Sequence, residues 1–240
     1  MWLTVLWFES DHRWWKGTQI RILQNLFKTL NMPCIAMRWA LYREWIQEWT
    51  NYRDPNSEKW RNIMHKYPQV DNMTPKAKYQ FEKKNIIDLH NEVYSTLQLF
   101  KKITENTKTD LIVLLDRTDI SNYFWLKKQN TKLSFQDFKN LLKNDLIIPD
   151  CTFYLNVPQD ILINRITHDT YPNSSRNKER KCTIKQYHTL YDNTIKDSEE
   201  RWFCIKEIEW WENIETVKKK LHQAIYEFLI LQQNKKKDGN

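Results

Sequence analysis

A nearly continuous apolar run, DLIVLLD at residues 110–116, most constrains the fold of this 240-residue chain. Such runs are typical of strands buried on both faces, which occur in parallel sheets covered by helices. Further β-rich segments at residues 3–8, 33–38, 150–157 and 201–208 alternate with segments of helical spacing. This alternation predicts an α/β fold with a central parallel sheet of the doubly wound type, flanked by helices in three layers.

The expected helices share apolar residues at helical spacing or clear end signals, and they cover residues 18–30, 75–100, 135–143, 159–168, 183–197 and 214–232. The second begins with Thr74 as N-cap and Pro75 at the first helical position. A polar stretch without apolar periodicity, HDTYPNSSRNKERK, precedes the fifth. We predict one domain over residues 1–232 and a frayed basic tail over 233–240.

The formal net charge of +8 suits anionic partners such as nucleotide phosphates or nucleic acid, and a merely basic surface is the alternative. No apolar run approaches the roughly 20 residues of a membrane span. The N-terminus lacks a basic leader with a small-residue cleavage site, so we expect a cytoplasmic protein. The four cysteines form no CxxC pair, which indicates neither a zinc site nor a disulfide framework.

Glycine is nearly absent, because only Gly17 and Gly239 occur, whereas tryptophan occurs 12 times. Ordinary usage of about 7% would give roughly 17 glycines in a chain of this length. The 2 glycines and 12 tryptophans together come close to this expected number of glycines. We therefore hypothesise that many tryptophans stand at glycine positions, because UGA codons that mean glycine in some lineages were translated as tryptophan. The alternative is a truly Trp-rich chain.

The first expected strand runs into FESDHRWWKGTQI, residues 8–20. A phosphate-binding loop needs a strand, a tight glycine-rich turn whose N–H groups cradle phosphate, and a lysine that opens a helix. Lys16 and Thr18 stand where this design requires them. Ser10 and Trp15, however, occupy the two glycine positions of GxxxxGK. An indole at position 15 would fill the space that glycine leaves for the phosphate.

Several segments, taken in order, resemble the thymidylate kinase family of P-loop nucleoside monophosphate kinases. FESDHRWWKGTQI is similar to the family's FEGxDxxGKxTQ, CIAMRW to its second-strand motif with arginine, and DRTDISN to its DRYxxSN. PDCTFYLNVPQDILINRI is similar to PDLTFYLDVPPEVALERI, and EIEWWENIETVKKKL to the closing strand, turn and helix. The resemblance spans nearly the whole chain and is weakest over residues 40–72 and 126–148.

This resemblance implies the P-loop kinase fold and the ATP- and Mg²⁺-dependent phosphorylation of dTMP to dTDP, with a degenerate or miscoded loop. The residues implied in ATP binding are Ser10, Asp11, His12, Arg13, Trp14, Trp15, Lys16, Gly17 and Thr18. Lys16 would hold the β- and γ-phosphates of ATP. Thr18 and Asp116 would lie beside the magnesium, because Gly17, directly after the lysine, offers no hydroxyl.

The acceptor side follows from the same resemblance. Arg38 and Arg117 would reach the acceptor phosphate, and Ser121 and Asn122 would help to enclose the nucleotide. A lid at about residues 168–182 would bring an arginine over the phosphates. The resemblance thus implies a catalytic set of Lys16, Asp116, Arg117 and Arg176, with Arg165 and Arg180 as alternatives to Arg176.

Structural alternatives remain open for these residues. Asp116 and Arg117 could form a surface ion pair, and Arg38 could be a solvated charge at a strand end. Ser121 and Asn122 could serve as a cap or turn, and the lid arginines could belong to a solvated loop. A homodimer is plausible for the family, although the sequence carries no interface signature.

The chain also departs from the family pattern. His12 stands at the position of the loop aspartate, and Thr118 replaces the aromatic residue of the DRY motif. Lys84 and Asn85 replace the family's Asn/Asp-Arg pair. The base specificity is therefore the weakest part of the resemblance.

Two other function classes compete with the kinase interpretation. A literal Trp15 favours a catalytically inactive relative that serves as a binding or structural protein. The tryptophans at positions 39, 45, 49 and 60 could instead stack on bases in a basic protein that binds single-stranded nucleic acid. We expect neither a nucleic-acid nor a membrane partner.

We predict that a version with glycine at positions 14, 15, 125, 210 and 211 converts dTMP to dTDP, whereas the printed chain does not. The reason is that close approach of phosphate to the loop backbone requires glycine. A coupled assay of ADP release measures both, and equal inactivity would contradict the enzyme interpretation. UGA codons at these positions would support recoding, whereas UGG codons would refute it.

Overall fold

The structure is a computed structural model that describes residues 3–10, 16–38, 73–117, 119–142, 145–167, 175–199, 203–209 and 212–238. Five strands lie in this part of the chain, namely β1 (Leu3–Glu9), β2 (Cys34–Arg38), β3 (Leu111–Asp116), β4 (Cys151–Asn156) and β5 (Ile205–Glu209). The bounds of β1 to β4 agree with the predicted segments within one residue, whereas β5 begins four residues later than predicted. All five strands pair in parallel in the order β2-β3-β1-β4-β5.

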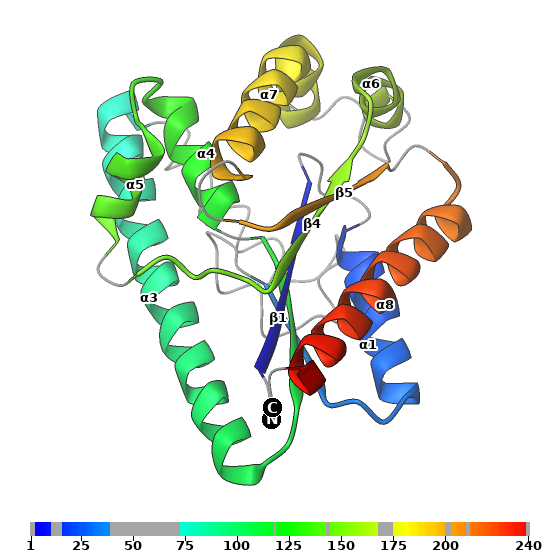
Figure 1. The fold of residues 1–240 in the computed structure, drawn as a ribbon. Helices are drawn as coiled ribbons and strands as arrows, with labels where there is room; N and C mark the ends of the chain where they lie inside the picture. Colours follow the sequence, from blue (N-terminus) through cyan, green and yellow to red (C-terminus); the bar gives the residue numbers. More distant parts are fainter. Residues whose placement is uncertain are drawn as a thin grey trace, which may run out of the picture.

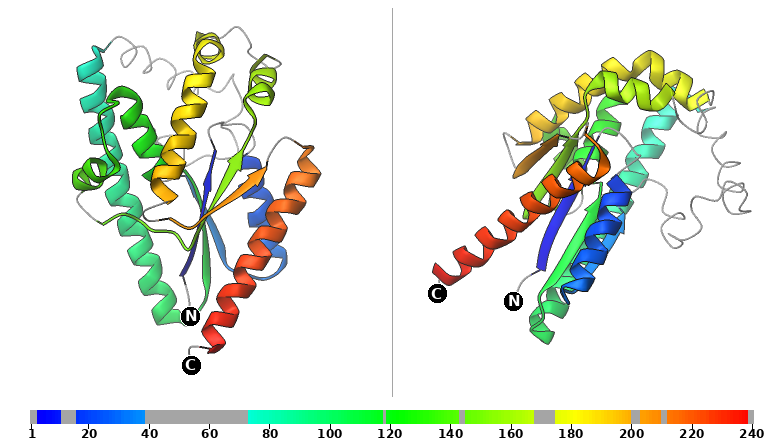
Figure 2. Two further views of the ribbon diagram at one scale, coloured as in Figure 1. Left: turned by 45° about the horizontal axis from the view of Figure 1, so that its top comes forward. Right: turned by 90° about the vertical axis from the view of Figure 1, so that its right-hand side faces the viewer.

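The described helices are α1 (Lys16–Thr29), α3 (Pro75–Thr107), α4 (Asp119–Gln129), α5 (Phe135–Leu141), α6 (Gln159–Thr167), α7 (Ser175–Glu199) and α8 (Ile214–Asp238). Helices α1 and α8 cover one face of the sheet, and α3, α4, α5 and part of α7 cover the other (Figure 1). The right-hand view of Figure 2 looks onto the face that carries α1 and α8. The three-layer α/β/α fold predicted from the sequence is confirmed.

The alternation of side chains along β1 divides the core into two parts. Val5 and Trp7 pack into the cluster formed with α3, α4 and α5. Leu6 and Phe8 pack into the cluster formed with α1 and α8. Because both faces of the strand are covered, it has no polar face, as the sequence pattern requires.

Helix α3 begins as the sequence predicts. Thr74 is its N-cap, and its hydroxyl accepts a 3.3 Å hydrogen bond from the Ala77 N–H, with Pro75 in the first turn. The helix extends seven residues beyond the expected end and stops at Lys108, whose φ of 55° is left-handed. A left-handed residue after the last turn terminates a helix because the chain can no longer continue its hydrogen bonds.

Three sequence interpretations need correction. The segment after the DRT motif forms helix α4, which was not among the predicted helices, and Trp125 lies in it. Helix α7 begins at Ser175, eight residues before the start predicted at residue 183. Helix α8 continues to Asp238, so most of the proposed basic tail is helical backbone.

Some predictions lie outside the described residues. These are the first half of the lid (168–174), the turn tryptophans Trp14, Trp15, Trp210 and Trp211, and the four tryptophans between residues 39 and 60. Among the helices that the structure describes, none combines the length and the apolar character needed to cross a membrane.

One buried polar pair joins α3 to α4 and generates a stability prediction. His90 Nδ1 lies 3.1 Å from Asp119 Oδ1, and both side chains are fully buried. Asp119 Oδ2 accepts a hydrogen bond of 3.4 Å from the Ile147 N–H. The carboxylate therefore binds α3, α4 and the segment before β4 together.

We predict that Asp119→Ala lowers the free energy of unfolding by about 3 kcal/mol, because it removes one partner of a buried polar pair. Urea unfolding followed by circular dichroism measures the change. Asp145→Ala, at an exposed position, is the control and should change it by no more than about 0.5 kcal/mol. Equal effects of the two substitutions would contradict a stabilising role of the pair.

Candidate functional site

The candidate site lies where the carboxyl ends of β1 and β3 meet the first turn of α1. Phe8 pairs in register with Asp116, so the two strands end side by side. Lys16 is the first residue of α1 and is 3% exposed, and its Nζ lies 3.0 Å from Asp116 Oδ1. The sequence separates these residues by 100 positions, and the parallel register brings them into one buried ion pair.

Burial lowers the pKa of the Lys16 ammonium below its usual range, because the charged form loses its hydration. The charge of Asp116 is the main influence that raises it again. The nearby Arg117 guanidinium lowers this pKa further, whereas the Glu9 carboxylate raises it. Asp116 is 4% exposed, so its ion pair with Lys16 is buried and does not lie at the surface.

Arg117 occupies the turn between β3 and α4 with a strained backbone. Its φ is 78°, in the left-handed region that disfavours residues with a Cβ. Its N–H donates a 3.3 Å hydrogen bond to the Phe8 carbonyl, which fixes the turn to the end of β1. Strained residues of this kind cluster at functional sites because the surrounding structure has to hold them in place.

The acceptor residues expected from the sequence lie on two neighbouring elements. Ser121 and Asn122 are buried in the first turn of α4, so they belong to the helix and not to an exposed turn. Arg38 ends β2 and pairs in register with Asp116, although its side chain lies outside the described atoms. The backbone positions of these residues thus fall at one end of the sheet.

A hydroxyl cluster around Glu9 was not expected from the sequence. Glu9 is fully buried at the end of β1, and its Oε2 accepts a 2.6 Å hydrogen bond from Ser121 Oγ. The Tyr191 hydroxyl on α7 donates a second hydrogen bond to the same oxygen. Glu9 belongs to the loop motif, and a charged residue at the end of an apolar strand was the signal that could have identified it.

Two buried amides of the site have atoms without hydrogen-bond partners among the residues that the structure describes. Gln19, in the first turns of α1, is fully buried, and neither its amide nitrogen nor its oxygen has a partner. The side-chain nitrogen of Asn122 also has no hydrogen-bond partner among the described residues. Buried polar groups are usually satisfied, so these two amides depart from the usual pattern within the described part of the chain.

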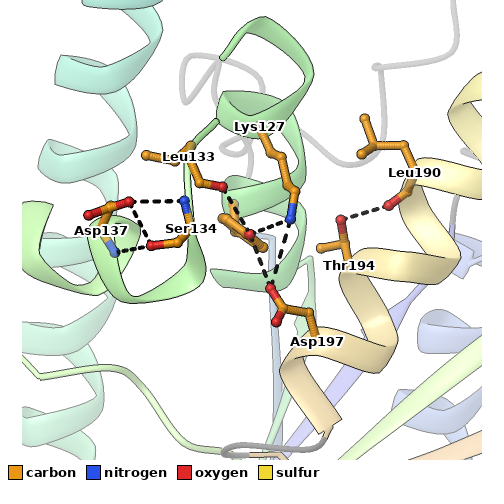
Figure 3. Close-up of polar contacts among 8 residues, drawn as sticks. Lys127, Leu133, Ser134, Asp137, Leu190, Thr194 and Asp197 are labelled. Carbon is orange, nitrogen blue, oxygen red and sulfur yellow. Dashed lines mark hydrogen bonds and ion pairs between the residues drawn. The ribbon is translucent and has the colours of Figure 1, made fainter. Parts of the chain in front are cut away.

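Helix α7 is fixed against α4 by a second polar cluster (Figure 3). The Lys127 ammonium donates a 2.7 Å hydrogen bond to the Tyr123 hydroxyl, which lies 3.1 Å from Asp197 Oδ2. Lys127 Nζ also lies 3.9 Å from the same carboxylate oxygen. These contacts fix the C-terminal half of α7, the helix whose first turn carries Arg176.

The remaining predicted residues divide into two groups. Gly17 and Thr18 lie in the first turn of α1, directly after Lys16, and are partly exposed, and Ser10 is buried directly after β1. Outside the described residues lie Asp11, His12, Arg13, Trp14 and Trp15, together with the side chains of Arg165, Arg176 and Arg180.

Comparisons with known proteins identify the family and the fold. The model of the family described as "Thymidylate kinase" matches residues 40–221, which is more than half of the chain. The crystal structure of thymidylate kinase from Ehrlichia chaffeensis is similar in fold, with a TM-score of 0.54 at 13% sequence identity. The match covers 93% of this chain and 98% of that one. No curated protein matches the sequence.

The ion pair generates a prediction about Lys16. Replacement of Asp116 by Asn should lower the Lys16 pKa further, because the carboxylate is the strongest influence that favours the charged ammonium. A titration of the lysine ¹³Cε resonances by NMR, assigned with Lys16→Arg, measures this value. Asp145→Asn should leave it unchanged, and an unchanged or higher pKa in Asp116→Asn would contradict the pairing.

The same shift fixes the sign of a pH effect on stability. The unfolded chain keeps the Lys16 proton up to its ordinary pKa of 10.5, whereas the folded chain loses it at lower pH. The unfolded state therefore binds more protons in this window, and the contribution of Lys16 to stability rises with pH across it.

Proposed function

The chain belongs to the thymidylate kinase family, and from this premise we propose that it transfers the γ-phosphoryl group of ATP to a nucleoside monophosphate, with dTMP as acceptor. The observation that carries the proposal is the buried Lys16–Asp116 pair of 3.0 Å where β1, β3 and α1 converge. This is the position at which a parallel α/β sheet binds phosphorylated ligands.

In the proposed reaction Lys16 supplies the positive charge for the donor phosphates. Phosphoryl transfer depends mostly on positioning and electrostatic stabilisation, so a cation at the transferred group is the main requirement. The N-terminus of α1 adds the partial positive charge of its free N–H groups. Lys16 would exchange its contact with Asp116 for the phosphate oxygens.

Asp116 is the residue best suited to hold magnesium or its bound water. A carboxylate oxygen is a ligand that Mg²⁺ prefers, and Mg²⁺ commonly takes its remaining ligands from substrate phosphates and water. The described residues contain no group of three or more His, Cys, Asp or Glu that could hold a metal by themselves. Magnesium held there would neutralise part of the charge of the donor phosphates. Thr18 provides a hydroxyl in the same turn, which Gly17 cannot.

The acceptor would bind between β2, the turn after β3 and α4. Arg117 and Arg38 would bind its phosphate, and the buried Ser121 and Asn122 would enclose the nucleoside. The choice of dTMP as acceptor rests on the family. The family's Asn/Asp-Arg pair is missing from this chain, and Lys84, which stands in its place with Asn85, is exposed. A cytoplasmic location and a homodimer also remain predictions.

A catalytically inactive relative is the second candidate function, and specific observations favour it. The match to the family model begins at residue 40 and so does not include the phosphate loop. Trp15 stands at the second glycine position of that loop, and Gly17 stands where a P-loop usually carries a hydroxyl. A protein of this kind would keep the sheet and the acceptor helices but would not bind ATP productively.

The proposal is tested in the full-length chain with Trp14→Gly and Trp15→Gly, using ATP, Mg²⁺ and dTMP in a coupled assay of ADP release. In this background Lys16→Ala should lower kcat by about 100-fold or more, the size expected when a charge stabiliser of the transition state is removed. Lys28→Ala, at the exposed end of the same helix, is the matched control and should retain full activity.

Two further outcomes separate the candidates. Removal of Mg²⁺ with EDTA should abolish ADP release, because the donor phosphates lose their counter-charge. Release of ADP with dGMP or dCMP but not dTMP would support the kinase and refute the base assignment. No ADP release with any nucleoside monophosphate, despite a folded protein, would refute the kinase and support the inactive relative.

A further inference from the structure

Two cysteines lie side by side at the amino ends of β4 and β5, at the opposite end of the sheet from the candidate site. Cys151 is the first residue of β4, and Cys204 directly precedes β5. Thr152 pairs in register with Ile205, and the Thr152 N–H donates a 2.8 Å hydrogen bond to the Cys204 carbonyl. The same register, continued by one residue, places the two cysteines opposite each other.

The spacing of parallel strands suits a disulfide at this position. Neighbouring strands lie about 4.8 Å apart, inside the range of roughly 4.4 to 6.8 Å that separates the Cα atoms of a disulfide. Residues that lie opposite each other on parallel strands also present their side chains on the same face of the sheet. Cys151 and Cys204 can therefore be joined without a change of register.

The two thiols differ in the property that decides which of them reacts first. Cys204 is exposed, whereas Cys151 is fully buried in the core cluster formed with α1 and α8. Burial, followed by the neighbouring Cys204 thiol, raises the pKa of the Cys151 thiol to about 12, so Cys151 stays protonated at neutral pH. The thiolate is the reactive form of cysteine, and access to it limits its oxidation. An oxidant from solution therefore reaches Cys204 first.

We propose that Cys151 and Cys204 form a redox-sensitive pair, which a hydroperoxide converts into a disulfide that joins β4 to β5. Cys204 is the thiol that the peroxide oxidises, and Cys151 is the thiol that resolves the oxidised form. Disulfides in reducing compartments are usually transient and redox-sensing, so a reversible cross-link fits the cytoplasmic location expected from the sequence. The inference does not depend on the proposed kinase function.

The oxidation balances in two steps. The Cys204 sulfur attacks one oxygen of hydrogen peroxide and the O–O bond breaks, which leaves a sulfenic acid, while the departing hydroxide takes up the thiol proton as water. The Cys151 sulfur then attacks the Cys204 sulfur, so that an S–S bond forms and the S–O bond breaks. The second hydroxide leaves as water with the Cys151 proton. The two thiols are thus oxidised by two electrons, and the peroxide is reduced to two water molecules.

The cross-link would stabilise one edge of the sheet. In the described part of the chain β5 pairs only with β4, so it is an edge strand (Figure 1). Position 204 lies 53 residues after position 151, and α6 and α7 lie between them. A disulfide that closes a loop of this length restricts the unfolded chain and thereby favours the folded one. The stability of the fold would therefore depend on the redox state of the pair.

The test uses the full chain with Cys34→Ser and Cys182→Ser, which retains only Cys151 and Cys204. After treatment of the folded protein with hydrogen peroxide, a peptide map should contain a cross-linked pair that is about 2 Da lighter than the two reduced peptides together. The Tm, measured by circular dichroism, should rise by about 10 °C. Dithiothreitol should reverse both changes.

A matched control keeps two thiols but separates them in the sheet. The variant Cys151→Ser, Cys182→Ser retains the half-buried Cys34 at the start of β2 and the exposed Cys204. The strands β3, β1 and β4 lie between β2 and β5, so neither an intramolecular cross-link nor a rise in the Tm is expected. Cys204 should instead accumulate as a sulfenic acid that dimedone labels, because the resolving thiol is absent.

A second control, Cys204→Ser in the first background, changes an exposed position and leaves the core intact. It should also prevent the cross-link. Oxidised glutathione, which reaches the same disulfide by thiol exchange, repeats the test without oxidation of methionine. Three results in a folded protein would overturn the proposal: no cross-link with either oxidant, an equal yield of a cross-link between Cys34 and Cys204, or a cross-link that leaves the Tm unchanged or lower.

Discussion

The burial of Lys16 against Asp116 is the interaction on which the candidate site depends. Transfer of two charges from water into a protein costs several kcal/mol for each ion, so they persist only where good geometry offsets that cost. Here the geometry comes from the sheet, because the register of β1 and β3 places Asp116 beside Phe8 and within 3.0 Å of the residue that opens α1. The apolar packing of α1 through Ile20 and Leu23 holds that helix against the sheet. The packing of the core thus determines the positions of the residues in the site.

Local signals explain why the sequence predicts so much of this fold. The five strands are short β-rich runs, and α3 carries its own N-cap in Thr74 and Pro75. Lys16 and Asp116 were identified because each directly adjoins a strand or helix that the sequence predicts well. Features of this kind depend on neighbours within a few residues, so they are readable without knowledge of the tertiary structure.

The errors have the opposite origin. Helix α4 has no clear apolar stripe in its sequence, because its first turns bury polar residues, Asp119, Ser121 and Asn122, against partners from other elements. The start of α7 was missed because its N-terminal segment is almost entirely polar. The contact between Glu9 and Tyr191 spans 182 positions, and no local pattern announces it. In each case the long-range partner decides the structure, and it is not visible in the segment itself.

The described tryptophans narrow the hypothesis of replaced glycines. Trp7 is fully buried and packs on Phe203 with centroids 5.5 Å apart, and Trp125 packs edge-on against Phe124 at the same distance. Trp7 is a core aromatic that a glycine could not replace without a cavity, whereas Trp125 is half-buried and packs against the same core cluster. The described left-handed positions, moreover, are Asn31, Lys108 and Arg117, so this chain fills with other residues some of the positions where glycine is usual. The total number of tryptophans therefore overstates how many of them stand at glycine positions. The argument for replaced glycines rests on the adjacent tryptophan pairs that precede α1 and α8.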